Sequence, residues 1–209
     1  MEWTVFKLKS WLLDLSRILQ EKKEELSRYD QAVGDGDHGV NMARGFKEVE
    51  KVLSQKNENQ DIGSLFQTVS SVLISKVGGA SGPLYGTLFL RMAVACKGKS
   101  TLSDQELVTA FAEGVQGLKM RGKAKAGDKT MVDVLEPVVR YMEQEKDDIS
   151  WQNVKKIAQQ SMESTKEMVA KKGRASFLGE RSAGHLDPGA VSSCYFLQTL
   201  ADQRLRGDV

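Results

Sequence analysis

The sequence has little of several features, and each shortage excludes a class of protein. Only two cysteines are present, Cys96 and Cys194, and they lie far apart in apolar stretches, which indicates free buried thiols. Free thiols suit a reducing compartment, so we expect a cytoplasmic protein. No apolar stretch approaches the roughly 20 residues that span a bilayer, and the N-terminus lacks the basic segment and apolar run of a signal peptide. We therefore expect no membrane partner.

An excess of charge of one sign is also missing. The 209 residues include 30 Lys plus Arg and 28 Asp plus Glu, whereas a nucleic-acid-binding protein normally shows a clear basic excess. We therefore expect no nucleic-acid partner. The length suits one ordinary domain or two small ones, and we take residues 1–209 as a single domain.

Proline and aromatic residues are scarce, while Ala, Leu, Lys, Glu and Gln are frequent. The chain has three prolines and 7% aromatic residues. β-Branched residues are scattered instead of alternating, so no strand is predicted. The expected fold class is all-α.

Apolar residues recur at helical spacing in eight segments. These segments are residues 5–29, 39–53, 62–73, 83–96, 103–118, 131–142, 151–168 and 187–200. Ser103 and Glu106 form a capping box at the start of the fifth helix. Asp187 and Pro188 are a good N-cap and first-turn pair for the eighth. Pro137 is expected to kink the sixth helix.

The connections between these helices alternate in composition. The connections after helices one, three, five and seven hold most of the 19 glycines, whereas the others, such as 54–61, are short and polar. Because short connections favour antiparallel neighbours, every second loop should lie at the same end of the bundle. If glycine served only tight turns, it would be equally frequent in the loops at both ends of the bundle. We therefore interpret the rim where the glycine-rich loops meet as the ligand site.

The first glycine-rich loop is also acidic. Residues 30–44 read D-Q-A-V-G-D-G-D-H-G-V-N-M-A-R, with Asp30, Asp35 and Asp37 within eight residues. Such carboxylates repel one another unless a cation lies among them, and Mg²⁺ takes oxygen ligands that it often shares with a phosphate. A helix start near His38 would favour an anion. The stretch therefore predicts a metal–phosphate site, the alternative being a solvated turn with an Asp N-cap.

Three familiar motifs do not fit this loop. Gly34, Gly36 and Gly39 match G-x-G-x-x-G, but a helix and not a strand precedes them. Gly34 and Gly39 also have Walker-A spacing, yet Val40 and Asn41 replace the required Lys and Ser or Thr. A calcium loop would need a later Glu that is absent here.

Residues in the other loops have both a functional and a structural interpretation. Ser81 in G-G-A-S-G-P adds a hydroxyl donor to backbone amides that can approach an anion, or the loop is only a tight turn. Lys123, Lys125, Lys129 and Arg174 either balance phosphate charge or are solvated. Met131 either packs against a flat aromatic base of a ligand or belongs to the core, which is the commoner use of Met.

Four stretches together resemble a known family. They are G-D-G-D-H-G-V-N-M, K-V-G-G-A-S-G-P-L-Y-G-T, R-G-K-A-K-A-G-D-K-T-M-V-D and K-G-R-A-S-F-L-G-E-R-S-A-G-H-L-D-P-G. In this order they resemble the ADP-binding L subunits of phosphotransferase-system-dependent dihydroxyacetone kinases, and the similarity spans essentially the whole chain. The resemblance implies an eight-helix antiparallel up-and-down barrel with the nucleotide at one rim.

The resemblance also implies site residues and cofactors. Asp30, Asp35 and Asp37 correspond to the ligands of two Mg²⁺ ions that accompany ADP or ATP. The implied nucleotide contacts are His38, Gly39, Val40, Asn41, Ala80, Ser81, Gly122, Met131, Arg174, Leu186, Asp187 and Pro188, with Thr130 and Gly189 as neighbours.

The implied activity is that of a kinase subunit whose nucleotide stays bound as a cofactor. An M subunit carrying a phosphohistidine would recharge ADP to ATP in place. The γ-phosphoryl group would then pass to dihydroxyacetone held covalently on a K subunit. Two alternatives stay open at this point: a domain like the fatty-acid kinases, and a nucleotide-dependent regulator of a transcription factor.

Overall fold

The computed structural model describes residues 2–55 and 61–207. Much of the predicted polar connection 54–61 lies outside these residues. The long helices are α1 (Val5–Glu21), α3 (His38–Gln55), α4 (Ile62–Lys76), α5 (Ser81–Ala95), α6 (Asp104–Gly122), α7 (Val132–Glu145), α8 (Trp151–Ser164) and α9 (Pro188–Leu205). Three short 3₁₀ helices follow α7 and α8: η1 (Lys146–Asp148), η2 (Thr165–Glu167) and η3 (Arg174–Ser182).

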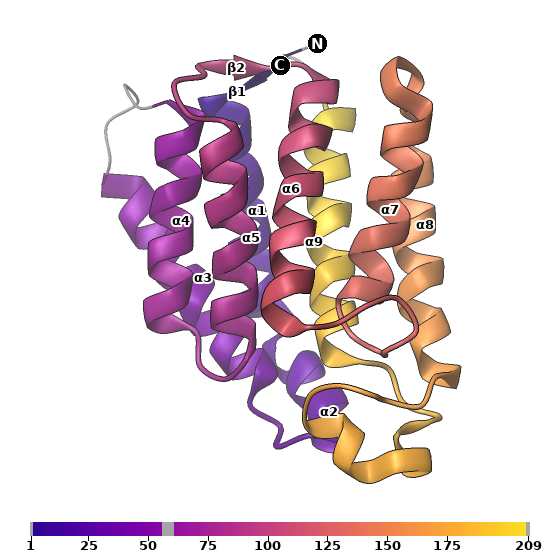
Figure 1. Ribbon diagram of the computed structural model, residues 1–209. Helices are drawn as coiled ribbons and strands as arrows, with labels where there is room; N and C mark the ends of the chain where they lie inside the picture. Colours follow the sequence, from indigo (N-terminus) through magenta and orange to yellow (C-terminus); the bar gives the residue numbers. More distant parts are fainter. Residues whose placement is uncertain (1, 56–60, 208–209) are drawn as a thin grey trace.

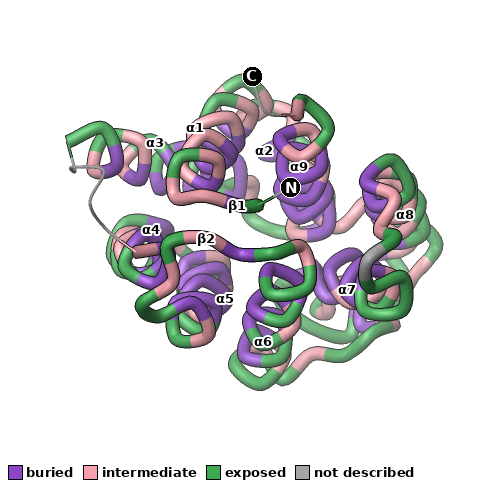
Figure 2. The backbone as a smooth tube through the Cα atoms, turned by 90° about the horizontal axis from the view of Figure 1, so that it is seen from above, coloured by how far each residue is buried: buried purple, intermediate pink, exposed green. Residues whose placement is uncertain are grey.

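The eight long helices lie side by side (Figure 1) and close into a ring when seen from above (Figure 2). From α3 to α9, each long helix packs against the next one in the chain. The ring closes through α1, which packs against both α9 and α3 (Figure 2). The expected all-α, up-and-down arrangement is therefore confirmed. Within the described residues, no helix combines the length and apolar character needed to cross a membrane.

Aromatic side chains fill the middle of the ring. Phe196 of α9 lies between Trp11, Phe89 and Phe111, with ring centroids 4.8, 5.8 and 5.6 Å away. All four side chains are buried. The capping box at Ser103 and the Asp187–Pro188 start of α9 are present as predicted.

The first predicted helix is wrong in one respect, because residues 5–29 do not form one helix. The chain breaks at Lys22, and a separate helix α2 (Lys23–Val33) follows α1. No Pro or Gly marks this break in the sequence. Glu24 and Glu25 favour a new helix start electrostatically, but the direction of α2 is set by packing against α3, α9 and η3 at one end of the ring. The break therefore has a tertiary cause.

The prediction of no strand is also wrong. At the other end of the ring, β1 (Trp3–Thr4) and β2 (Thr101–Leu102) form an antiparallel pair, with Trp3 opposite Leu102 (Figure 1). Two-residue strands are too short to show an alternating pattern. The seventh predicted helix, α8, ends at Ser164 and not at Met168, because residues Thr165–Glu167 form the 3₁₀ helix η2.

Candidate functional site

All four glycine-rich connections line one cavity of about 360 Å³ at the end of the ring that carries α2 and η3. They are the α2–α3, α4–α5 and α6–α7 connections and the long segment between α8 and α9 (Figure 1). The predicted convergence of every second loop is therefore confirmed. That a nucleotide binds there stays a prediction.

Four helices begin at this cavity. His38 of α3, Ser81 of α5, Val132 of α7 and Pro188 of α9 are first residues of their helices, and all four line the cavity. The alternating direction of the helices around the ring brings these N-termini together. The positive ends of four helix dipoles then meet at one space, which favours an anion. The sequence indicated an anion site at two of these helix starts, near His38 and at Ser81, and not at the other two.

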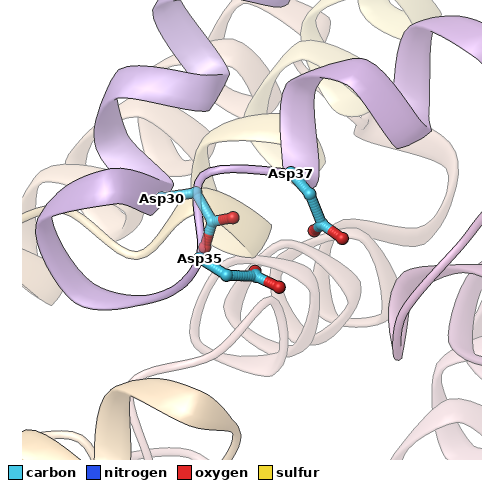
Figure 3. Close-up of side chains that lie close together, drawn as sticks. All are labelled: Asp30, Asp35 and Asp37. Atoms are coloured by element: carbon cyan, nitrogen blue, oxygen red, sulfur yellow. The ribbon is translucent and has the colours of Figure 1, made fainter.

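Three carboxylates gather on one side of the cavity (Figure 3). Asp30, Asp35 and Asp37 each offer an oxygen that lies within 4.8 Å of the others. Asp30 is buried, in the last turn of α2 and not in the turn itself, whereas the other two are exposed. Burial raises the pKa of Asp30 above its ordinary value, the His38 amide opposes the rise, and the charges of Asp35 and Asp37 add to it. A divalent cation would relieve this repulsion, and an all-oxygen donor set fits Mg²⁺.

Two glycines give the acidic cluster its room. A Cβ on Gly34 would overlap the carboxylate of Asp30, and Gly36 has a φ of 78°, which side chains rarely adopt. Asp30 in turn accepts a hydrogen bond from the backbone N–H of His38 at 3.1 Å. Gly34 therefore makes room for the carboxylate of Asp30, and Gly36 allows the turn that leads to Asp37.

His38 is buried and is held at both ring nitrogens. Nδ1 lies 3.1 Å from Ser81 Oγ, and Nε2 lies 3.0 Å from Ser192 Oγ of α9, which also contacts the hydroxyl of Tyr85 at 2.9 Å. Burial lowers the pKa of His38 to about 4, so the ring is neutral at pH 7. His38 therefore connects α3, α5 and α9 as an uncharged group. The sequence did not predict the roles of Ser192 and Tyr85 at the site, because both lie on buried faces of their helices, where they cannot be distinguished from core residues.

A buried aspartate shapes the third loop. Asp133 accepts hydrogen bonds from the backbone N–H groups of Gly127 at 2.5 Å and Thr130 at 2.7 Å. Removal from water raises the pKa of Asp187 to about 7; the Ala190 amide that it caps opposes the rise, and the charge of Asp133 adds to it. The fourth connection contributes Arg174, whose guanidinium pairs with Asp35.

Most of the residues predicted for the site lie in the cavity wall. They are Asp30, Asp35, Asp37, His38, Asn41, Ala80, Ser81, Gly122, Thr130, Met131, Arg174, Asp187, Pro188 and Gly189. Gly39, Val40 and Leu186 do not line it. Gly39 faces α2, Val40 is exposed, and Leu186 packs against the core.

Wall residues that sequence reasoning missed are of two kinds. Leu84, Leu118 and Val132 form an apolar part of the wall, and their helical spacing does not distinguish them from core residues. Arg121 and Lys172 add positive charge. Lys123 and Lys125, weighed as partners of phosphate, are not in the wall, while Lys129 is in it but fully buried.

The position of Gly39 leads to a prediction. Gly39→Ala should lower the free energy of unfolding by about 2–3 kcal/mol, because its Cβ would overlap the carbonyl oxygen of Lys23 and crowd Ser27, both on α2. Urea unfolding would measure the loss. Val40→Ala, at the exposed next residue, should change stability by less than about 0.5 kcal/mol. Equal stability of the Gly39 variant and the parent would contradict the close approach of α2 and α3.

Comparison with known proteins places the chain in a family. The family model of the DAK2 domain matches residues 32–202. The ADP-binding subunit of PEP-dependent dihydroxyacetone kinase 1 of Listeria innocua is 47% identical over 91% of this chain and 92% of its own length. The corresponding subunit of Escherichia coli is 43% identical over 92% and 93%.

A solved structure agrees with the fold. The dihydroxyacetone kinase of C. freundii, crystallised with AMP-PNP and Mg²⁺, superimposes with a TM-score of 0.75 over 97% of this chain, at 24% identity. This chain spans 34% of that larger protein. From the match to the domain model and the full-length relatives, the chain belongs to the DAK2 domain family, which includes the ADP-binding subunits of PEP-dependent dihydroxyacetone kinases.

Proposed function

We propose that this chain is the nucleotide-binding subunit of a PEP-dependent dihydroxyacetone kinase, holding ADP or ATP with two Mg²⁺ ions in the cavity at the rim. The observation that carries the proposal is that three clustered carboxylates and four helix N-termini line the same cavity. A site for a polyphosphate needs both, because the metal and the amides neutralise different parts of its charge. The names of the two full-length relatives support the same substrate and nucleotide.

Each side of the cavity has its own task in this proposal. Asp30, Asp35 and Asp37 hold Mg²⁺, which when bound neutralises charge on the transferring phosphoryl group. Amides at the starts of α3, α5 and α9, with Ser81 and Arg174, bind phosphate oxygens. The apolar wall, including Leu84, Leu118 and Met131, packs against the nucleobase.

The transfer itself needs no nucleophile from this chain. The two ring nitrogens of His38 are both engaged, and the chain's other histidine, His185, does not line the cavity. In our proposal the γ-phosphoryl group therefore passes directly from ATP to dihydroxyacetone bound covalently on a K subunit. A phosphohistidine on an M subunit then restores ATP. The protein contributes position and charge neutralisation, which supply most of the rate in such transfers.

The proposal also places the protein in the cytoplasm. Cys96 and Cys194 are buried and unpaired, which suits a reducing compartment.

A reconstitution assay tests this function. The purified protein, mixed with K and M subunits, phosphoenolpyruvate and the general phosphotransferase proteins, should form dihydroxyacetone phosphate with ADP present only in an amount equal to the protein. Omission of the M subunit should abolish product formation, because the bound ADP would not be rephosphorylated; protein loaded with ATP instead should then give only one turnover. ADP should also be the small molecule that co-purifies, as its mass would show.

The same assay separates the alternatives. Phosphorylation of a fatty acid by the protein with ATP, without K and M subunits, would contradict the proposal and favour a fatty-acid kinase. Nucleotide binding without any phosphoryl transfer would favour a regulator.

A further inference from the structure

A buried lysine beside the cavity has no part in the proposed transfer. The side chain of Lys129, in the α6–α7 connection, is 0% exposed, and its backbone φ is 60°. Lysines are almost never fully buried unless their charge is satisfied, and residues other than glycine are uncommon at positive φ. Two unfavourable features at one residue indicate that the position of its ammonium group matters.

The ammonium group of Lys129 joins two distant points of the chain. Its Nζ donates hydrogen bonds to the carbonyl oxygens of Met168 at 3.0 Å and Ser182 at 2.5 Å. These two carbonyls lie at the start and the end of residues 168–182, which we call the strap. The backbone N–H of Lys171 also donates to the carbonyl of Asp128 at 3.0 Å. One side chain and its neighbour therefore fasten the strap to the α6–α7 connection.

The strap's own ends are also joined by a hydrogen bond from the Ala170 N–H to Ser182 Oγ at 2.8 Å, but its contacts with the rest of the protein are limited. It contains η3, whose 3₁₀ geometry gives poorer hydrogen bonds than an α-helix, and glycines with positive φ at Gly173 and Gly179. Its buried apolar residues, Ala170 and Ala175, pack with Val33 of α2 in a cluster separate from the main core. Segments with so few buried contacts open at low free energy. The ammonium group of Lys129 is therefore the main polar side-chain link between the strap and the α6–α7 connection.

The strap carries Arg174 to the cavity. Arg174 lines the cavity and pairs with Asp35, although its side chain is 64% exposed. A long exposed side chain on a loosely packed segment reaches one position only if its backbone is held. The backbone is held through the carbonyls at the two ends of the strap.

We propose that Lys129 is a positioning residue, whose ammonium group ties both ends of the strap and thereby holds Arg174 at the cavity for the phosphates of the nucleotide. The role of Arg174 rests on the proposed function. The tether itself does not, so the two are tested separately.

Hydrogen–deuterium exchange tests the tether without any ligand. In Lys129→Met the amides of residues 169–184 should exchange at least tenfold faster than in the parent, while the core helices α5 and α9 keep their rates. Lys171→Met is the matched control: it removes the same charge from an exposed side chain on the strap and should leave the rates unchanged. Unchanged exchange in the Lys129 variant would overturn the proposal. If that variant does not fold, Lys129→Gly, which suits the positive φ, replaces it.

A double-mutant cycle tests the link to Arg174. By calorimetry, Lys129→Met and Arg174→Ala should each weaken Mg-ADP binding about tenfold, and the double variant should be no weaker than either alone, since both remove the same contact. A double variant that is about a hundredfold weaker would mean that Lys129 acts independently of Arg174, which would overturn its positioning role. If the parent does not bind Mg-ADP, the proposed function fails, and the exchange experiment still decides whether the tether exists.

Discussion

Asp30→Ala is expected to weaken the binding of Mg-ADP at least about a hundredfold, or ~2.7 kcal/mol, while the helix content stays the same. Asp30 is the buried member of the acidic cluster and offers one of three oxygens within 4.8 Å of one another. Its loss removes the one carboxylate that burial fixes in place and leaves only two exposed carboxylates for the two proposed Mg²⁺ ions. Isothermal titration calorimetry measures the affinity, and circular dichroism measures the helix content.

The stability of the metal-free variant gives a second readout. Because the pKa of Asp30 in the folded protein is above its ordinary value, ionisation of this carboxyl reduces stability as the pH rises through the acid range. At pH 7 the Asp30→Ala substitution removes this unfavourable charge and also the hydrogen bond to the His38 amide. The two effects oppose each other, so the free energy of unfolding should change by no more than about 1 kcal/mol. A large loss of Mg-ADP affinity with little change in stability distinguishes a metal ligand from a residue that is needed only for folding.

A carboxylate elsewhere provides the control. Asp202→Ala, on the last turns of α9, removes a carboxylate that pairs with Lys155 and should leave the affinity for Mg-ADP unchanged. Unaltered affinity in the Asp30 variant would show that the acidic cluster does not hold the metal.

Phe196→Ala is expected to lower the free energy of unfolding by about 3–5 kcal/mol. Its ring lies among Trp11, Phe89 and Phe111, and removing it would leave a cavity that these large rings cannot fill without shifting. Urea unfolding followed by tryptophan fluorescence would measure the change. The effect is large because one side chain joins α1, α5 and α6 to α9.

An exposed phenylalanine is the natural comparison. Phe177 of η3 is 88% exposed, so Phe177→Ala should change the free energy of unfolding by less than about 0.5 kcal/mol. A loss below about 1 kcal/mol in the Phe196 variant would contradict an aromatic centre of the ring.

Much of the site could be predicted because its signals are local. The spacing of Asp30, Asp35 and Asp37 and the glycines beside them are visible in the sequence, and so is the alternation of glycine-rich loops. Lys129 shows where such reasoning ends. In sequence it is a lysine on a loop, which predicts either a solvated or a phosphate-bound side chain, yet it is buried and hydrogen-bonded to carbonyls 39 and 53 residues away. Partners so distant in sequence leave no pattern near the residue.

By itself the sequence determined the all-α class, most helix positions, the N-caps at Ser103 and Asp187 and the acidic cluster, because helical periodicity and capping depend on neighbours within a few residues. Only the tertiary structure decided the break at Lys22, which carries Asp30 on a separate helix. It also decided the neutral state of His38 and the meeting of four helix N-termini at one cavity. These features depend on burial and on contacts between distant segments, and burial exists only once the ring has closed.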